Sequence, residues 1–154
     1  VKILRSLVLK KVEVFFDQYI FKTALRALGF GILLTIMVQS SSITTSTIVP
    51  LAGAGVLTLR QIFPFTLGAN IGTTVTALLA AITGTVAALI AAISHLLFNI
   101  FGIIIIYGLP FLRVIPLKFA ERIADYSIKN KLTPFVYLLI VFVAIPLSII
   151  LLGR

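Results

Sequence analysis

Apolar residues run along this chain in long stretches that no charged residue interrupts. Such stretches lie between Arg26 and Arg60 (33 residues), between Arg60 and Arg113 (52 residues) and between Lys131 and Arg154 (22 residues). A helix that crosses the hydrocarbon core of a bilayer needs about 20 apolar residues, so each stretch can hold at least one crossing. The pattern predicts an all-α integral membrane protein.

The stretches differ in how they can cross the membrane. The 52-residue stretch predicts two transmembrane helices, over residues 61–83 and 85–109, and the last stretch predicts another over residues 132–152. The 33-residue stretch is too long for one span and too short for two spans with a loop. It therefore predicts a re-entrant hairpin over residues 23–58, whose two arms enter and leave the membrane on the same side.

Polar residues gather in two places inside these apolar stretches. The first is VQSSSITTST, residues 38–47, at the centre of the predicted hairpin. Non-helical backbone at membrane depth needs hydrogen-bond partners that lipid cannot supply, and hydroxyl groups can supply them. We expect the hairpin to turn at this sequence.

The second polar segment is GANIGTTVTA, residues 68–77, inside the next predicted span. Two glycines four residues apart suit close helix packing of the GxxxG type. Glycine, asparagine and threonine at the centre of a span also suit a discontinuous helix with an unwound middle. Both interpretations fit the residues, and we expect the span over 61–83 to be broken.

Composition and charge agree with a membrane protein. Of the residues, 60% are hydrophobic and 11% are charged, and the mean hydropathy is +1.23. Most of the net charge of +9 comes from clusters in residues 1–26 and 113–131, which favour anionic lipid over nucleic acid. We expect both clusters to be cytoplasmic, in a multi-pass protein of the cell (plasma or inner) membrane, with interfacial segments at residues 1–22 and 110–131.

Other features limit the chemistry. The chain has no cysteine, and its basic first residues do not form a signal peptide. It does not begin with Met, which suggests a fragment or a trimmed start. The only acidic residues lie in the two basic segments: Glu13, Asp17, Glu121 and Asp125.

The hairpin tip predicts an ion site. The helix that begins there offers free N–H groups and a partial positive charge to an anion such as phosphate. The helix that ends there offers carbonyl oxygens, which together with hydroxyl oxygens suit a sodium ion. Because no carboxylate lies in the predicted membrane core, a co-bound anion is the simplest balance for the cation's charge, which favours sodium–anion symport.

These residues resemble a known family. The sequences VQSSS, FPFTLGANIGTTVTALLAA and SHLLFNIFGIIIIYGLPFLR closely resemble the second repeat of the type II sodium–phosphate cotransporters. The resemblance runs from about Lys2 to the end of the chain. It implies sodium-coupled symport of inorganic phosphate, with no further cofactor, at a site shared by two inverted repeats.

The resemblance also implies roles for single residues. Positions matching the sodium site are Gln39, Ser40, Thr73 and Thr76, whereas phosphate is expected at Ser41 and Ser42 with Asn70 and Thr74 as neighbours. The family's first QSSS repeat is absent, as is the membrane helix that precedes its basic segment. The chain resembles half a transporter that needs the other repeat or a second copy of itself.

Two other functions fit some of the residues. A non-transporting assembly subunit would use the hydroxyl groups only to pack helices together. An intramembrane serine hydrolase would pair a QSSS serine with His95, the only histidine, but no Gly-x-Ser-x-Gly sequence surrounds these serines. We expect no enzyme, and a contact between His95 and Asn99 that serves helix packing.

Overall fold

The structure is a computed structural model that describes residues 14–153, all of whose regular elements are helical. This confirms the predicted all-α fold. The chain forms two compact units, Val1–Leu112 and Arg113–Arg154, which are described separately. Of the predicted interfacial segment at residues 1–22, the first thirteen residues lie outside the described part.

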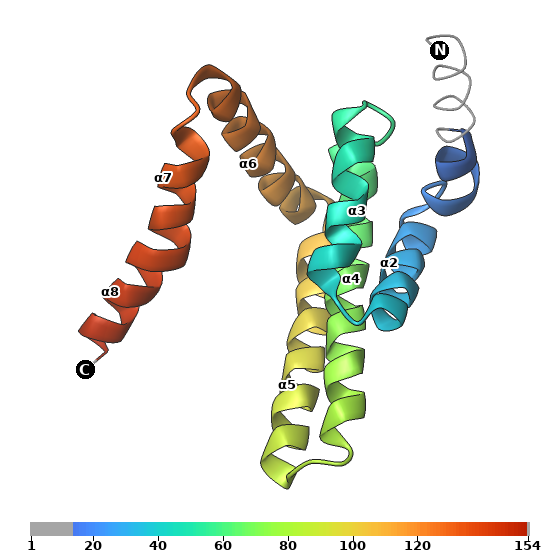
Figure 1. Cartoon of the computed structure of the whole chain (residues 1–154), viewed down its shortest axis with the longest axis vertical. Coiled ribbons are helices and arrows are strands. Elements are labelled where there is room, and N and C mark those ends of the chain that lie inside the picture. Colours follow the sequence, from blue (N-terminus) through green and yellow to red (C-terminus); the bar gives the residue numbers. More distant parts are fainter. Residues whose placement is uncertain (1–13, 154) are drawn as a thin grey trace. The chain divides into compact units, whose positions relative to one another are not determined.

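Within the described residues, the first unit contains two short π-helices and four complete α-helices (Figure 1). A hydroxyl side chain caps the N-terminus of each α-helix, which explains where the helices begin. In chain order the elements are η1 (Phe16–Ile20), α2 (Ala24–Val38), α3 (Ser41–Gly53), α4 (Leu59–Ala81), α5 (Val86–Gly102) and η2 (Ile103–Tyr107).

Helix lengths separate the hairpin from the spans. In α2 and α3 there are 15 and 13 residues, or about 22 and 20 Å of helix, which is less than the hydrocarbon thickness of about 30 Å. By contrast, α4 has 23 residues, and α5 continues through η2 to give a 22-residue helix, Val86–Tyr107. Both are long and apolar enough to cross a membrane, whereas α2 and α3 are each shorter than the hydrocarbon thickness.

The expected break in the span over residues 61–83 is wrong, because α4 is a continuous helix from Leu59 to Ala81. Its threonine hydroxyls donate to carbonyls of their own helix, as when Thr73 Oγ1 donates to Ala69 O at 3.1 Å. Its glycines are used for packing, since a Cβ on Gly68 would meet the backbone of Leu28 in α2. Of the two interpretations left open by the sequence, helix packing is the correct one.

An apolar core joins the hairpin to α4. Phe65 of α4 is fully buried and contacts the rings of Phe21 and Phe30, with centroids 5.9 and 6.0 Å apart. Around it lie the other buried members of the core: Ala27, Ile48, Val56 and Leu57. The hairpin is therefore fixed to the half of α4 that begins at Leu59.

The second unit consists of a basic helix and an apolar one. Most of α6 (Pro110–Lys129) belongs to it, followed by α7 (Thr133–Leu139), η3 (Ile140–Ala144) and α8 (Ile145–Leu152). The last three form one apolar helix of 20 residues, Thr133–Leu152, long enough to cross a membrane. Thr133 Oγ1 donates to Tyr126 O at 3.3 Å, and the rings of Phe119 and Tyr137 lie 6.5 Å apart, so α6 folds back on α7.

Candidate functional site

The closest helix packing in the first unit is between α2 and α4. A Cβ on Gly31 would meet the backbone of Phe65 and lie 3.0 Å from Ala69 N. A Cβ on Gly72 would lie 2.6 Å from the Cβ of Thr35. Small residues at these positions let the two backbones touch, as is typical of membrane helices.

These contacts also fix the register of the two helices. Gly31 lies beside Phe65 and Ala69, and four residues further along α2, Thr35 lies beside Gly72. The helices therefore run in the same direction. One more turn along each brings Gln39, at the end of α2, opposite Thr76 of α4. The hairpin turn thus lies at the level of the threonine-rich segment of α4.

The turn itself takes two residues. Gln39 has a left-handed backbone conformation (φ 57°, ψ 24°), and its N–H donates to Thr35 O at 2.7 Å. Among the residues that the structure describes, no other non-glycine residue has a positive φ. Ser40 is extended, and its hydroxyl accepts a hydrogen bond from Ile43 N–H at 3.3 Å. The chain reverses here without glycine, at a cost of about 1–2 kcal/mol for Gln39.

The N-terminus of α3 can hold an anion. Ser41 and Ser42 are its first two residues, and their N–H groups precede the point where intrahelical bonding begins. Ser41 is half-buried and Ser42 is exposed. Their hydroxyls and N–H groups supply several donors, and the helix end adds a partial positive charge.

The threonines of α4 divide between two sides of the helix. Thr76 continues the row Phe65, Gly72 that faces α2. Thr74 is fully buried on the row that leads to Ala77 and Ala81, two of the residues that line a groove against α5. Thr74 Oγ1 donates to Ile71 O at 2.7 Å, and Thr76 Oγ1 donates to Thr73 O at 2.8 Å. Their oxygens keep lone pairs for a cation.

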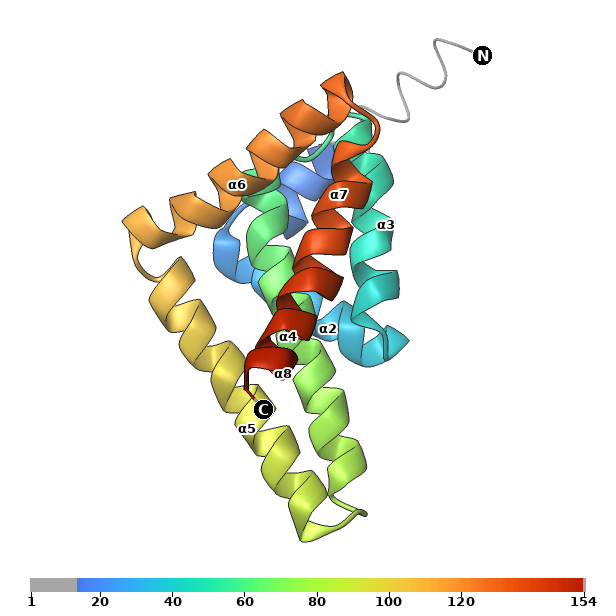
Figure 2. The same ribbon diagram turned by 90° about the vertical axis from the view of Figure 1, so that its left-hand side faces the viewer.

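The structure therefore brings together only part of the predicted site. By the helical register, Gln39 and Ser40 in the turn lie at the level of Thr76, and their role in a sodium site stays a prediction. Asn70 is exposed, one turn from Thr74 on the row toward α5. In Figure 2, α4 lies between α3 and α5. The serines belong to α3 and Asn70 belongs to α4.

Three buried polar groups were given no role in the ion site by sequence reasoning. Thr35 Oγ1, Thr44 Oγ1 and Asn99 Nδ2 are buried and have no hydrogen-bond partner among the described residues. The sequence could have indicated Thr35 as a site residue, because it lies one helical turn before Gln39 on the same side of α2. Asn99 Nδ2 makes no hydrogen bond with His95, and the packing contact expected between these residues stays a prediction. His95 itself is exposed.

Comparison with known proteins identifies the family. Residues 2–112, more than half of the chain, match the Na+/Pi-cotransporter family. The chain belongs to this cotransporter family. The match ends with the first unit at Leu112 and covers the hairpin, α4, α5 and η2.

Curated relatives agree with this assignment. Sodium-dependent phosphate transport protein 2B of Bos taurus is 42% identical over 131 residues, which cover 82% of this chain and 19% of the relative. Protein 2C of Rattus norvegicus is 42% identical over 126 residues (79% and 21%), and protein 2A of Oryctolagus cuniculus is 40% identical over 124 residues (78% and 19%).

The matching proteins are transporters and not enzymes, as the sequence predicts. The chain spans about a fifth of the length of these relatives. No solved structure matches the chain.

Proposed function

We propose that the chain takes part in sodium-coupled transport of inorganic phosphate and supplies one half of the ion and substrate site. One observation carries the proposal. The hairpin turn of α2 and α3, with its exposed helix N-terminus, lies in register with the threonine-rich segment of α4. The names of the relatives, which describe sodium-dependent phosphate transport, support the choice of ions.

Phosphate binds at the start of α3. Ser41 and Ser42 donate hydrogen bonds from their hydroxyls and N–H groups to the phosphate oxygens, and Asn70 and Thr74 are its neighbours on α4. All these groups are uncharged, so they bind the anion without holding it as tightly as an arginine pair would. Release to the other side of the membrane stays possible.

Sodium binds beside the turn. Its ligands are oxygens of Gln39, Ser40, Thr73 and Thr76, a neutral set that suits a hard cation. Because the described part of the first unit contains no Asp or Glu between Arg26 and Leu112, the negative charge of phosphate offsets that of sodium. Each ion then raises the affinity for the other, which is the basis of coupled transport.

A second protein segment is needed to complete the ion and substrate site. We infer that the other repeat of a longer transporter, or a second copy of this chain, covers the face on which α3 and α5 flank α4. In this arrangement the short α2 and α3 form a re-entrant hairpin whose turn lies at membrane depth. The basic segments at residues 1–26 and 113–131 lie on the cytoplasmic side and contact anionic lipid.

The test is phosphate binding by the purified chain in nanodiscs, with sodium and then with potassium. We expect binding in sodium only, and a loss of about tenfold or more in Ser41→Ala, because a hydrogen bond to a charged group contributes about 1.5–3 kcal/mol. Ser46→Ala, one turn further along α3 and exposed, is the matched control.

Two results would contradict the proposal. Equal binding in sodium and potassium would exclude coupling at this site. If instead Ser41→Ala lowers only the thermal stability and leaves binding intact, the hydroxyls serve helix packing, as in an assembly subunit. A chain that binds phosphate in neither salt would exclude self-association, and uptake by the assembled transporter would then decide whether the other repeat supplies the missing half.

A further inference from the structure

Asn99 is the most unusual polar residue of α5. Its Nδ2 is buried and has no hydrogen-bond partner among the described residues. A buried amide nitrogen without a partner is destabilising, and such groups in folded proteins call for an explanation such as a bound ligand. The amide nitrogen is a donor only, so it can serve an anion or a water molecule but not a cation.

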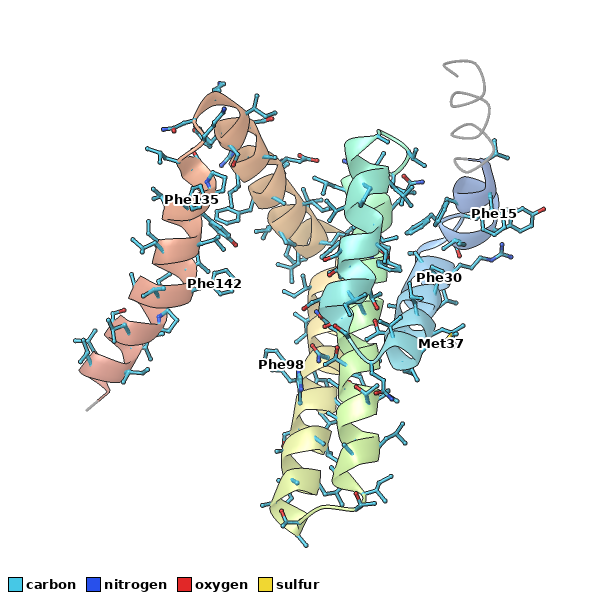
Figure 3. The ribbon with its side chains drawn as sticks, in the orientation of Figure 1. Phe15, Phe30, Met37, Phe98, Phe135 and Phe142 are labelled. Carbon is cyan, nitrogen blue, oxygen red and sulfur yellow. The ribbon has the colours of Figure 1, made fainter. Side chains whose placement is uncertain are left out.

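The helical spacing of α5 turns Asn99 toward α4. Ala88, Ala92 and His95 line the groove of about 510 Å³ between α5 and α4. Asn99 follows His95 by four residues and Ala92 by seven, which places it on the same side of the helix. Its neighbour Phe98 is exposed and projects from α5 on the side away from α4 (Figure 3).

The register between α4 and α5 gives the level of Asn99. The helices are antiparallel, because Ala81 and Ala88 both lie close to Gly84 in the turn and the rings of Phe63 and Tyr107 are 5.7 Å apart at the other end. Interpolation between these contacts puts Asn99 opposite Asn70 and Ile71. It therefore lies at the level of the polar segment of α4, where Asn70 and Thr74 occupy the row toward α5.

We propose that Asn99 is a further phosphate-binding residue, whose amide N–H₂ donates to a phosphate oxygen on the face of α4 that carries Asn70. The inference rests on the proposed function and adds a position for phosphate on the side of α4 that faces α5, where Asn70 and Thr74 lie. The buried donor is explained, because phosphate supplies the acceptor that the chain lacks at this position.

The experiment compares Asn99→Leu and Asn99→Asp with the unaltered chain. It measures phosphate binding and the shift in thermal midpoint on adding phosphate, each in sodium and in potassium. Asn99→Leu has a similar volume and removes the unpaired donor. We expect it to melt at a higher temperature without phosphate and to bind phosphate about tenfold or more weakly in sodium. Ser94→Ala, one residue before His95 and exposed, is the control and should change neither readout.

Asn99→Asp separates an anion site from a cation site. A carboxylate beside phosphate repels it, so binding should fall at least as far as in Asn99→Leu. If Asn99→Asp instead keeps phosphate binding and lowers the sodium concentration needed for it, the amide oxygen binds sodium and the proposal is overturned.

The remaining outcomes also decide the matter. Unchanged phosphate binding in Asn99→Leu would overturn the role of Asn99 and leave the proposed function intact. If the unaltered chain shows no sodium-dependent phosphate binding, the same variants are compared by phosphate uptake in the assembled transporter, where unchanged uptake in Asn99→Leu would overturn the role of Asn99.

Discussion

On the side of α4 that faces α2, glycines let two backbones touch, whereas on the side that faces α5, alanines line an open groove. The first side fixes the register of the hairpin and holds Gln39 opposite Thr76. The second side leaves Asn99 Nδ2 without a partner and α5 with Ala92 as its only buried residue. One side of the helix positions a turn, and the other leaves room for something to bind.

The largest effect should come from adding a side chain where α2 and α4 are in backbone contact. A Cβ at Gly31 would meet backbone atoms, which cannot move aside, so Gly31→Ala should lower the free energy of unfolding by about 1–3 kcal/mol or more. Gly29, two residues earlier in α2, has nothing within 4 Å of its Cβ position. Gly29→Ala should stabilise the helix by about 0.5–1 kcal/mol. Thermal unfolding in detergent measures both, and equal midpoints would show that α2 and α4 are not in contact.

The second-largest effect tests whether the side of α4 that faces α2 binds sodium. Thr76→Val keeps the shape of the side chain and removes its oxygen. We expect about tenfold more sodium to be needed for half-maximal phosphate binding, the equivalent of about 1.4 kcal/mol. Thr66→Val is the control, because its hydroxyl also bonds within α4, to Ile62 O at 3.1 Å, but lies far from the turn. A similar shift in both variants would argue against a sodium site at Thr76.

Gln39 offers a smaller effect that separates strain from ion binding. Gln39→Gly removes the cost of the left-handed conformation and should raise the free energy of unfolding by about 1 kcal/mol. Gln39→Ala keeps that cost. Both variants lose the amide oxygen, so both should need more sodium. If the two melt at the same temperature, the turn is not strained at this residue.

The smallest effect is expected on the open side. Ala77→Leu places a larger side chain into the groove of about 510 Å³, where it has room. We expect the free energy of unfolding to change by less than about 1 kcal/mol, far less than for Gly31→Ala. A loss as large as that of Gly31→Ala, measured by the same thermal unfolding, would remove the distinction between the two sides.

The sequence predicted the membrane helices better than it predicted how they pack. Stretches without charge mark the spans, since a charge in the hydrocarbon is costly wherever the helix lies. The same reasoning could not decide whether Gly68 and Gly72 break α4 or pack it, because glycine suits both. Only the contact of Gly68 with Leu28 settles the question.

The candidate site was predicted as a set of residues and not as an arrangement. The hydroxyl-rich QSSS turn stands out in an apolar chain, and so does the segment that contains Asn70. The direction of α2 along α4 depends on contacts between residues more than thirty positions apart, such as Gly31 and Phe65. A role for Asn99 beyond helix packing could not be predicted, because a lone asparagine in a span is common in helix packing.

The most direct test of the account measures access to the hairpin turn. Because the chain has no cysteine, Ser42→Cys introduces a single thiol at the exposed start of α3. We predict that a charged thiol reagent labels it from water, and that phosphate slows the labelling in sodium but not in potassium. Ser46→Cys should show no such protection. A thiol at residue 42 that is labelled at the same rate with and without both ions would contradict the claim that this turn binds them.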